Sequence, residues 1–222
     1  GGNAIDAAIA SAFALGVCEP QSSGIGGQTM MLMYIAKTGK TIAVDGSSRA
    51  PNRATIEKLN DKSIRLHGYK ATTVPSTPAV LAYILEKYGT LPLSRILEAP
   101  IRIAEEGYII TELQNRLQKR EAKKFKMYNG ADLFLNKGKA YKTGSVFKQE
   151  VLANTLKIIA KKGIEEFYIG GIAKIIEDDM IKNDALIRCD DLARIPYPIE
   201  REAISCNFKN MKIMTFPPPA SG

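Results

Sequence analysis

The residues best suited to chemistry in this sequence form one short polar run, Asp45-Gly46-Ser47-Ser48-Arg49. A guanidinium group can bind a carboxylate through two parallel hydrogen bonds, so Arg49 is a candidate substrate ligand. We predict that Ser47, Ser48 and Arg49 form a substrate-binding wall. The alternative is structural: Arg49 would form an ion pair that holds the loop, for example with Asp45.

A second candidate is the glycine-rich run Gly24-Ile25-Gly26-Gly27. A dinucleotide-binding loop of the G-x-G-x-x-G type would need glycine at position 29, which is Thr29, and would lead into a helix. A strand-like run follows here instead. We therefore interpret these glycines as a tight turn that needs positive φ angles and close backbone packing near the site.

Other catalytic arrangements lack the necessary residues. The single histidine, His67, excludes a multi-histidine metal site and an H-E-x-x-H motif, and no G-x-S-x-G sequence accompanies it. Cys18, Cys189 and Cys206 are too few and too dispersed for a disulfide framework or a C-x-x-C metal site. We therefore assign no catalytic residue within this sequence and expect neither a metal nor an organic cofactor.

Two predicted strands must position the polar run. Residues 29–36 and 41–44 are separated by Lys37-Thr38-Gly39-Lys40, a pattern typical of a β-hairpin. The first strand is apolar on both faces, so we expect it to lie in a sheet that is covered on both sides. A glycine loop would then lie at one end of this sheet and the Ser-Ser-Arg loop at the other.

Capping residues and helical periodicity predict a largely helical middle of the chain. Asn3 with Asp6 begins the first helix, and Thr77 as cap with Pro78 as first helical residue begins another. Residues 52–61 form a short amphipathic stretch. Further helices are predicted over 92–107, 111–126, 149–162, 172–181 and 188–192, a turn or short helix over 164–168, and strands over 200–207 and 211–216. Strand signals near both ends indicate one sheet with helical layers packed on it.

The composition is that of a globular chain, with 222 residues, 45% hydrophobic and 24% charged. The net charge of +8 is spread along the chain, and the densest basic clusters, Lys119 to Lys126 and Lys161-Lys162, lie in predicted helices as solvated faces. We expect no nucleic-acid partner, and no apolar run is long enough to span a membrane. The chain starts at Gly1-Gly2 without Met, so a leader could precede it; the compartment is left open, with cytoplasmic favoured over periplasmic or secreted.

A series of collinear motifs resembles the gamma-glutamyltranspeptidase family. The motifs are Asn3-Ala4-Ile5-Asp6-Ala7-Ala8, Glu19-Pro20, Ser22-Ser23-Gly24-Ile25-Gly26-Gly27, Asp45-Gly46, Ala50-Pro51, Pro75-Ser76-Thr77-Pro78-Ala79, Lys87-Tyr88-Gly89-Thr90-Leu91-Pro92-Leu93, Phe167-Tyr168-Ile169-Gly170-Gly171-Ile172-Ala173, Asp190-Asp191-Leu192-Ala193 and Pro217-Pro218-Pro219-Ala220-Ser221-Gly222. They span nearly the whole chain, which makes the resemblance far more specific than any single glycine loop.

The resemblance implies the α+β fold of N-terminal-nucleophile hydrolases, a four-layer α/β/β/α sandwich, with this chain giving mainly the helical layers and several strands. Residues 1–222 would be part of one such domain, the N-terminal part of a large subunit. The family is made as a precursor that cuts itself before a threonine, whose hydroxyl then attacks an amide carbonyl. Thr72 and Thr73 do not match that motif, so the nucleophile would come from a small subunit outside this sequence.

The implied activity is acyl transfer from, or hydrolysis of, γ-glutamyl amides such as glutathione. In transpeptidases of this family, an arginine directly after the Asp-Gly or Asp-Phe pair binds the α-carboxylate of the glutamyl group. That position is Ser47 here, and Arg49 follows two residues later. Acylase-like members look similar in this loop. Two alternatives therefore stay open: an acylase-like amidohydrolase with a different acyl donor, and a homologue that binds amino acids or peptides without turnover.

Overall fold

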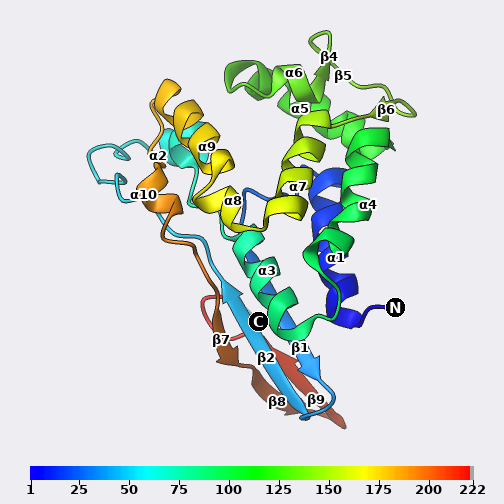
Figure 1. Ribbon diagram of the computed structural model, residues 1–222. Helices are drawn as coiled ribbons and strands as arrows, with labels where there is room; N and C mark the ends of the chain where they lie inside the picture. Colours follow the sequence, from blue (N-terminus) through cyan, green and yellow to red (C-terminus); the bar gives the residue numbers. More distant parts are fainter. Residues whose placement is uncertain (221–222) are drawn as a thin grey trace.

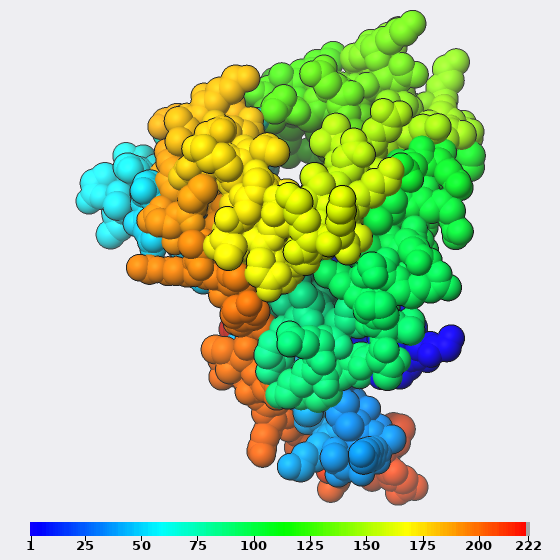
Figure 2. Space-filling view, in the orientation of Figure 1, coloured from blue at the N-terminus to red at the C-terminus, as the bar shows by residue number. Residues whose placement is uncertain are grey.

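The computed structural model describes residues 1–220 and places helices on one side of a small β-sheet (Figure 1). The helices are α1 (Ala4–Cys18), α2 (Lys62–Leu66), η1 (Tyr69–Ala71), α3 (Thr77–Tyr88), α4 (Leu93–Glu106), α5 (Glu112–Met127), α6 (Ala131–Phe134), α7 (Glu150–Lys162), α8 (Glu165–Tyr168), α9 (Gly171–Lys182) and α10 (Cys189–Leu192). The strands are β1 (Thr29–Ile35), β2 (Lys40–Gly46), β3 (Tyr108–Ile109), β4 (Leu135–Asn136), β5 (Lys139–Ala140), β6 (Val146–Phe147), β7 (Ile199–Glu202), β8 (Ile204–Phe208) and β9 (Met211–Thr215). The strands near the two ends of the chain make up the narrow lower part of the molecule in Figure 2, and the helices make up the broader upper part.

Capping residues fix the start of the first helix where the sequence predicts it. The Asn3 side chain accepts hydrogen bonds from the backbone N–H groups of Ile5 and Asp6, at 2.8 and 2.9 Å, and the Asp6 carboxylate accepts from the Asn3 N–H in return. This reciprocal capping box confirms the predicted start of α1.

The start of α3 differs by one residue from the prediction. Thr77 is the first helical residue and Ser76 occupies the cap position, so the assignment of Thr77 as cap and Pro78 as first helical residue was wrong. The reason is tertiary: the Ser76 hydroxyl bonds to the backbone carbonyl of Gly46 in β2 instead of capping its own helix.

The main sheet has the strand order β1-β2-β7 and is antiparallel throughout, with Thr29 opposite Gly46 and Val44 opposite Glu200. The two ends of the chain therefore meet in one sheet, as predicted. The strand predicted over 200–207 is broken at Ala203, however, and β8 pairs with β9 in a separate hairpin. Of the final Pro-Pro-Pro motif, Ser221 and Gly222 lie outside the described residues.

Helices cover one face of β1. Met33 points into the core and is buried, whereas Leu32 and Tyr34 on the other face are 41% and 66% exposed. Because successive strand residues point to opposite faces, this alternation means that α3 and its neighbours cover one side alone. Within residues 1–220, helices thus cover one face of the sheet, and the second covering layer of the prediction is not among these residues.

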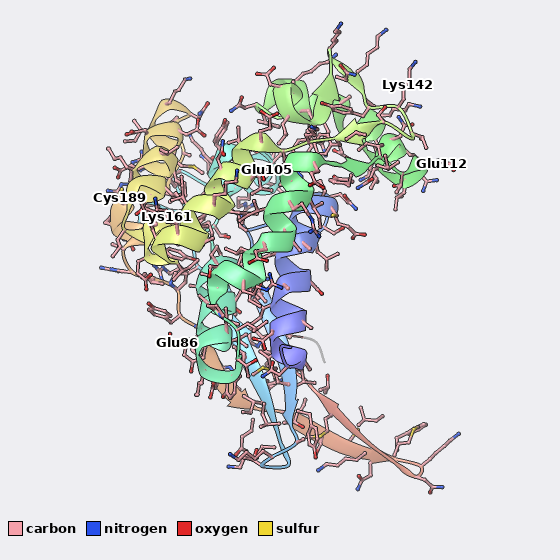
Figure 3. All side chains as sticks on the ribbon, turned by 45° about the vertical axis from the view of Figure 1, so that its right-hand side comes forward. Glu86, Glu105, Glu112, Lys142, Lys161 and Cys189 are labelled. Carbon is pink, nitrogen blue, oxygen red and sulfur yellow. The ribbon has the colours of Figure 1, made fainter. Side chains whose placement is uncertain are left out.

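The core lies between α1, α3, α4, α7 and α8. Its fully buried side chains come from all five helices and include Phe13, Ile84, Leu97, Leu156 and Tyr168. Charged residues of both signs project from the helical body, as the labelled side chains show (Figure 3). The labelled charged residues on helices are Glu86, Glu105, Glu112 and Lys161, and Lys142 lies in the loop between β5 and β6.

The glycine run, residues 24–27, forms a turn that contacts α1 at Gly24, while Gly26 and Gly27 are exposed. A Cβ atom added to Gly16 of α1 would lie 3.3 Å from the Cα of Gly24, so the turn presses directly against the helix. Gly24, Gly26 and Gly27 are not among the residues with positive φ. The predicted close packing is found at Gly24 alone, because a Cβ atom on Gly26 would meet no atom within 4 Å, and the prediction of positive φ was wrong.

The segment between β2 and α3 also differs from its prediction. Residues 52–61, predicted as an amphipathic stretch, form turns, and the short helices α2 and η1 follow them. Among residues 1–220, no helix combines the length and the hydropathy needed to cross a membrane.

Candidate substrate-binding site

The polar loop, residues 47–49, begins directly after β2 and is organised by a buried carboxylate. Asp45 is 6% exposed, and its Oδ1 accepts hydrogen bonds from the Ser47 backbone N–H at 3.1 Å and the Ser47 hydroxyl at 2.6 Å. Arg201 of β7 donates to Asp45 Oδ2 at 3.1 Å. Burial acts to raise the pKa of Asp45, but the bonds from Ser47 and Arg201 outweigh it and hold the pKa below its ordinary value. Asp45 is therefore ionised, and its cationic partner is Arg201, not Arg49.

Ser48 connects the polar loop to two other segments. Its backbone N–H and hydroxyl both donate to Gln28 Oε1, at 3.0 and 3.3 Å, and its hydroxyl accepts from the Thr73 hydroxyl at 3.0 Å. No motif in the sequence points directly to Gln28. Its position follows from the hairpin register, because Gln28 precedes the Thr29 that pairs with Gly46.

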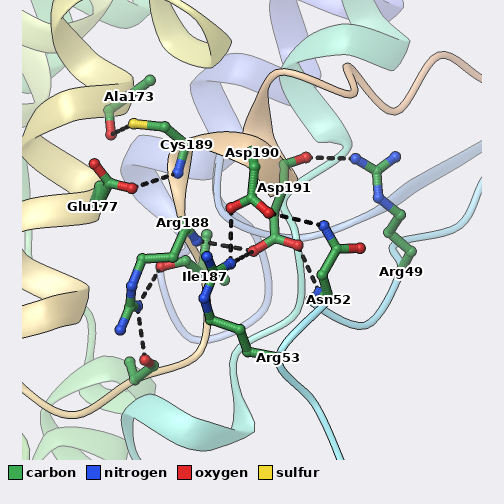
Figure 4. Close-up of polar contacts among 11 residues, drawn as sticks. Arg49, Asn52, Arg53, Ala173, Glu177, Ile187, Arg188, Cys189, Asp190 and Asp191 are labelled. Atoms are coloured by element: carbon green, nitrogen blue, oxygen red, sulfur yellow. Dashed lines mark hydrogen bonds and ion pairs between the residues drawn. The ribbon is translucent and has the colours of Figure 1, made fainter.

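Arg49 has a structural role in this chain. Its Nη2 donates to the backbone carbonyl of Asp191 at 2.5 Å (Figure 4). The same Nη2 also donates to the carbonyl of Arg194, and the Arg49 carbonyl accepts from the Val74 N–H at 2.9 Å. The guanidinium thus holds the polar loop against the segment after α10. It does so through backbone carbonyls, not through the carboxylate proposed as the structural alternative.

The residues after the polar loop are fixed by the acidic pair Asp190 and Asp191. The Asn52 N–H donates to Asp191 Oδ1 at 2.6 Å, and Arg53 forms an ion pair with Asp190 at 2.8 Å (Figure 4). Asp191 also accepts from the Arg188 N–H at 2.9 Å and is 1% exposed. The motif at Asp190 is visible in the sequence, but its partner lies about 140 residues away along the chain, so its role was not predicted.

The glycine run is attached to the start of α3. The backbone N–H groups of Ser76 and Thr77 both donate to the Gly27 carbonyl, at 2.9 and 3.2 Å. The Thr29 hydroxyl donates to the Thr77 hydroxyl at 3.0 Å. Because Thr29 pairs with Gly46, the polar loop and the glycine run lie at the same end of the sheet, next to the start of α3, and the prediction that they lie at opposite ends was wrong.

The remaining candidates for chemistry lie apart from this wall. His67 is exposed at the end of α2, and no group of three or more His, Cys, Asp or Glu in residues 1–220 could hold a metal ion. Cys18 and Cys189 are half-buried free thiols, and Cys206 is an exposed one. The polar loop thus presents a polar surface, and its contact with a substrate stays a prediction.

Comparisons with known proteins agree with this geometry. The chain matches the sequence profile of the gamma-glutamyltranspeptidase family over residues 1–222. It is 35% identical to a glutathione hydrolase proenzyme of Escherichia coli, covering 100% of this chain and 39% of that protein. It is also 35% identical to an acylase ACY 1 proenzyme of a Pseudomonas species, covering 100% of this chain and 42% of that one. The chain thus spans about two fifths of the length of these relatives.

A solved structure gives the same result. The crystal structure of Helicobacter pylori gamma-glutamyltranspeptidase superposes with a TM-score of 0.93 at 36% identity, covering 99% of this chain and 65% of that one. The mixed α and β fold is that of the N-terminal-nucleophile hydrolases, and the predicted fold class is confirmed. The chain belongs to the gamma-glutamyltranspeptidase family.

Proposed function

We propose that this chain is the N-terminal part of an enzyme that transfers or hydrolyses the acyl group of γ-glutamyl amides such as glutathione. Residues 1–222 are part of one N-terminal-nucleophile hydrolase domain and supply its scaffold and one wall of its site. The observation that carries this proposal is the match to the family along the whole chain, together with the polar loop at the end of β2.

The nucleophile in this proposal is the N-terminal threonine of a small subunit, outside these residues. Its hydroxyl attacks the amide carbonyl of the donor while its own amino group takes the proton. The acyl group then passes from the threonine to water or to an amino acid. This scheme requires no histidine, which fits a chain whose single histidine lies apart from the site.

The uncovered face of β1 supports such a partner. Leu32 and Tyr34 expose apolar surface on this face, and burial of apolar surface is the main favourable term in the association of protein segments. The segment that carries the threonine packs on this face in our proposal. The relatives are named proenzymes, as expected for precursors that are processed into two subunits.

Ser47, Ser48 and Arg49 contact the donor in this proposal. The Ser47 side chain is exposed, and the other two are half-buried. Ser47 donates its hydroxyl hydrogen to Asp45, which leaves its oxygen available as an acceptor. Arg49 uses Nη2 for the loop, and Nε and Nη1 are its remaining donors to a substrate.

An acylase-like activity is the second candidate, and one observation favours it. The position after Asp45-Gly46, where transpeptidases of the family carry an arginine, is Ser47, and the guanidinium of Arg49 is turned toward the carbonyls of Asp191 and Arg194. Without a cation at position 47, a donor that lacks an α-carboxylate would lose little binding. The acylase relative is as similar to this chain as the glutathione hydrolase.

A matched pair of donors separates the two activities. A γ-glutamyl anilide and a 4-aminobutyryl anilide differ only by the α-carboxylate, so the ratio of their kcat/KM values measures its recognition. Using the product of the complete gene, a preference for the γ-glutamyl donor of more than about tenfold, worth 1.4 kcal/mol, supports the first activity. Equal turnover supports the acylase, and saturable binding without product supports the homologue that binds without catalysis.

A further inference from the structure

We propose that Ser76 is a positioning residue that fixes the polar loop relative to the glycine run and thereby sets the affinity for the acyl donor. This inference rests on the proposed function and adds a specific residue to it. Ser76 precedes α3, is fully buried, and lies outside the polar loop itself.

Ser76 bonds to both loops at once. Its backbone N–H donates to the carbonyl of Gly27 at 2.9 Å, and its hydroxyl donates to the carbonyl of Gly46 at 2.5 Å. These two glycines end the glycine run and β2, respectively. A single residue therefore links the two segments that border the site.

The bond to Gly46 controls the orientation of Ser47. The carbonyl of Gly46 and the N–H of Ser47 belong to one planar peptide unit. Ser76 holds the oxygen of that unit, and Asp45 Oδ1 holds its N–H at 3.1 Å. The peptide that carries Ser47, the position where transpeptidases of the family carry an arginine, is thus fixed from both sides.

Close packing allows this contact. A Cβ atom on Gly46 would lie 2.3 Å from the Thr29 carbonyl oxygen and 2.3 Å from a methyl group of Val80. Because glycine has no Cβ, β2 can approach the first turn of α3 closely enough for the Ser76 hydroxyl to reach it.

Tyr168 of α8 fixes the backbone around Ser76. Its hydroxyl donates to the Pro75 carbonyl at 3.0 Å and accepts from the Ala79 N–H at 3.2 Å. Burial raises the pKa of Tyr168, so the hydroxyl stays protonated and keeps donating. Ser76 is therefore anchored by the helical body on one side and contacts the site on the other.

The test uses Ser76→Ala in the product of the complete gene. Loss of one buried hydrogen bond corresponds to a factor of about three to ten. We expect KM for the preferred anilide donor to rise about three- to tenfold, with kcat within about twofold, because the reacting groups lie elsewhere. A purely structural role would lower the fraction of active protein, and so kcat, and leave KM unchanged.

Thr90→Val is the matched control, because Thr90 follows the other end of α3 and donates its hydroxyl to Asp6 at 2.6 Å. We expect this variant to lower Tm without changing KM. Tyr168→Phe serves as a second variant, with a smaller rise in KM, should Ser76→Ala not fold.

Three results would overturn the inference. If the parent protein is active and both Ser76→Ala and Tyr168→Phe have the same KM as the parent, the role of Ser76 is refuted and the proposed function is unaffected. A rise in KM that Thr90→Val reproduces shows a general effect of destabilisation and also refutes it. A parent that neither turns over nor, by calorimetry, binds any donor refutes the proposed function and this inference together.

Discussion

Arg49 Nη2 lies 2.5 Å from the backbone carbonyl oxygen of Asp191, although 142 positions separate the two residues in the sequence. This contact joins the loop after β2 to the segment that leads into β7, and β7 in turn pairs with β2. The candidate site is therefore built where the two ends of the described chain meet.

Replacing Arg49 should destabilise the protein as well as change substrate binding. Arg49→Ala removes the two bonds to carbonyls, and we expect the free energy of unfolding to fall by about 1–3 kcal/mol, measured by urea denaturation. Arg49→Lys should recover part of this loss, because an ammonium can reach one carbonyl but cannot reproduce the planar fork. An Arg49→Ala variant as stable as the parent would show that these bonds contribute nothing.

Asp191 and Asp190 should differ sharply in their contribution to stability. Asp191→Asn keeps one acceptor oxygen and directs its N–H₂ group at the backbone N–H of either Asn52 or Arg188, so we expect a loss of about 2–4 kcal/mol. Asp190 is exposed and pairs with Arg53 at the surface, so Asp190→Asn should cost less than about 1 kcal/mol. Thermal unfolding of the two variants checks this order. Equal losses would contradict the stronger role assigned to the buried carboxylate of Asp191.

Acid should destabilise the protein partly through Asp6. Burial acts to raise the pKa of this carboxyl, but hydrogen bonds from Thr90, Asn3 and Leu91 outweigh it and hold the pKa well below its ordinary value of 3.8. A lowered folded-state pKa gives stability that is present above about pH 4 and lost as the pH falls below that value. We expect Tm of the parent to fall more steeply between about pH 4 and pH 2 than Tm of Asp6→Asn. Parallel curves would refute this role of Asp6.

Introducing a cation at position 47 should shift the choice of donor. Ser47 is exposed, so Ser47→Arg can extend a guanidinium toward a bound α-carboxylate. We expect kcat/KM for the γ-glutamyl anilide relative to the 4-aminobutyryl anilide to rise about tenfold, as one charged pair is worth 1.5 kcal/mol or more. Ser47→Lys is the control and should give a smaller gain, because a lysine ammonium group cannot form two parallel hydrogen bonds with a carboxylate. An unchanged ratio in Ser47→Arg would place the α-carboxylate elsewhere.

Local chemistry made much of the fold predictable. Asn3 and Thr111 cap α1 and α5 as the sequence indicates, each within a reciprocal capping box. The hairpin of β1 and β2 follows from two apolar runs around a glycine turn. These features depend on neighbours a few residues apart, which a single sequence displays directly.

The features that were missed depend on distant partners. The Ser76 hydroxyl bonds to Gly46 instead of its own helix, and Arg49 bonds to carbonyls near α10, because packing brings these groups together. The apolar pattern of β1 indicated two covered faces, but residues 1–220 cover one. A pattern records that a surface is to be buried, and it does not record which segment buries it.

The intact mass of the protein made from its complete gene, measured under denaturing conditions, tests the proposed function most directly. We predict two chains whose masses sum to that of the precursor, of which the smaller begins with threonine and the larger contains residues 1–222. A single uncut chain, with no new N-terminal threonine after prolonged incubation, would contradict the account.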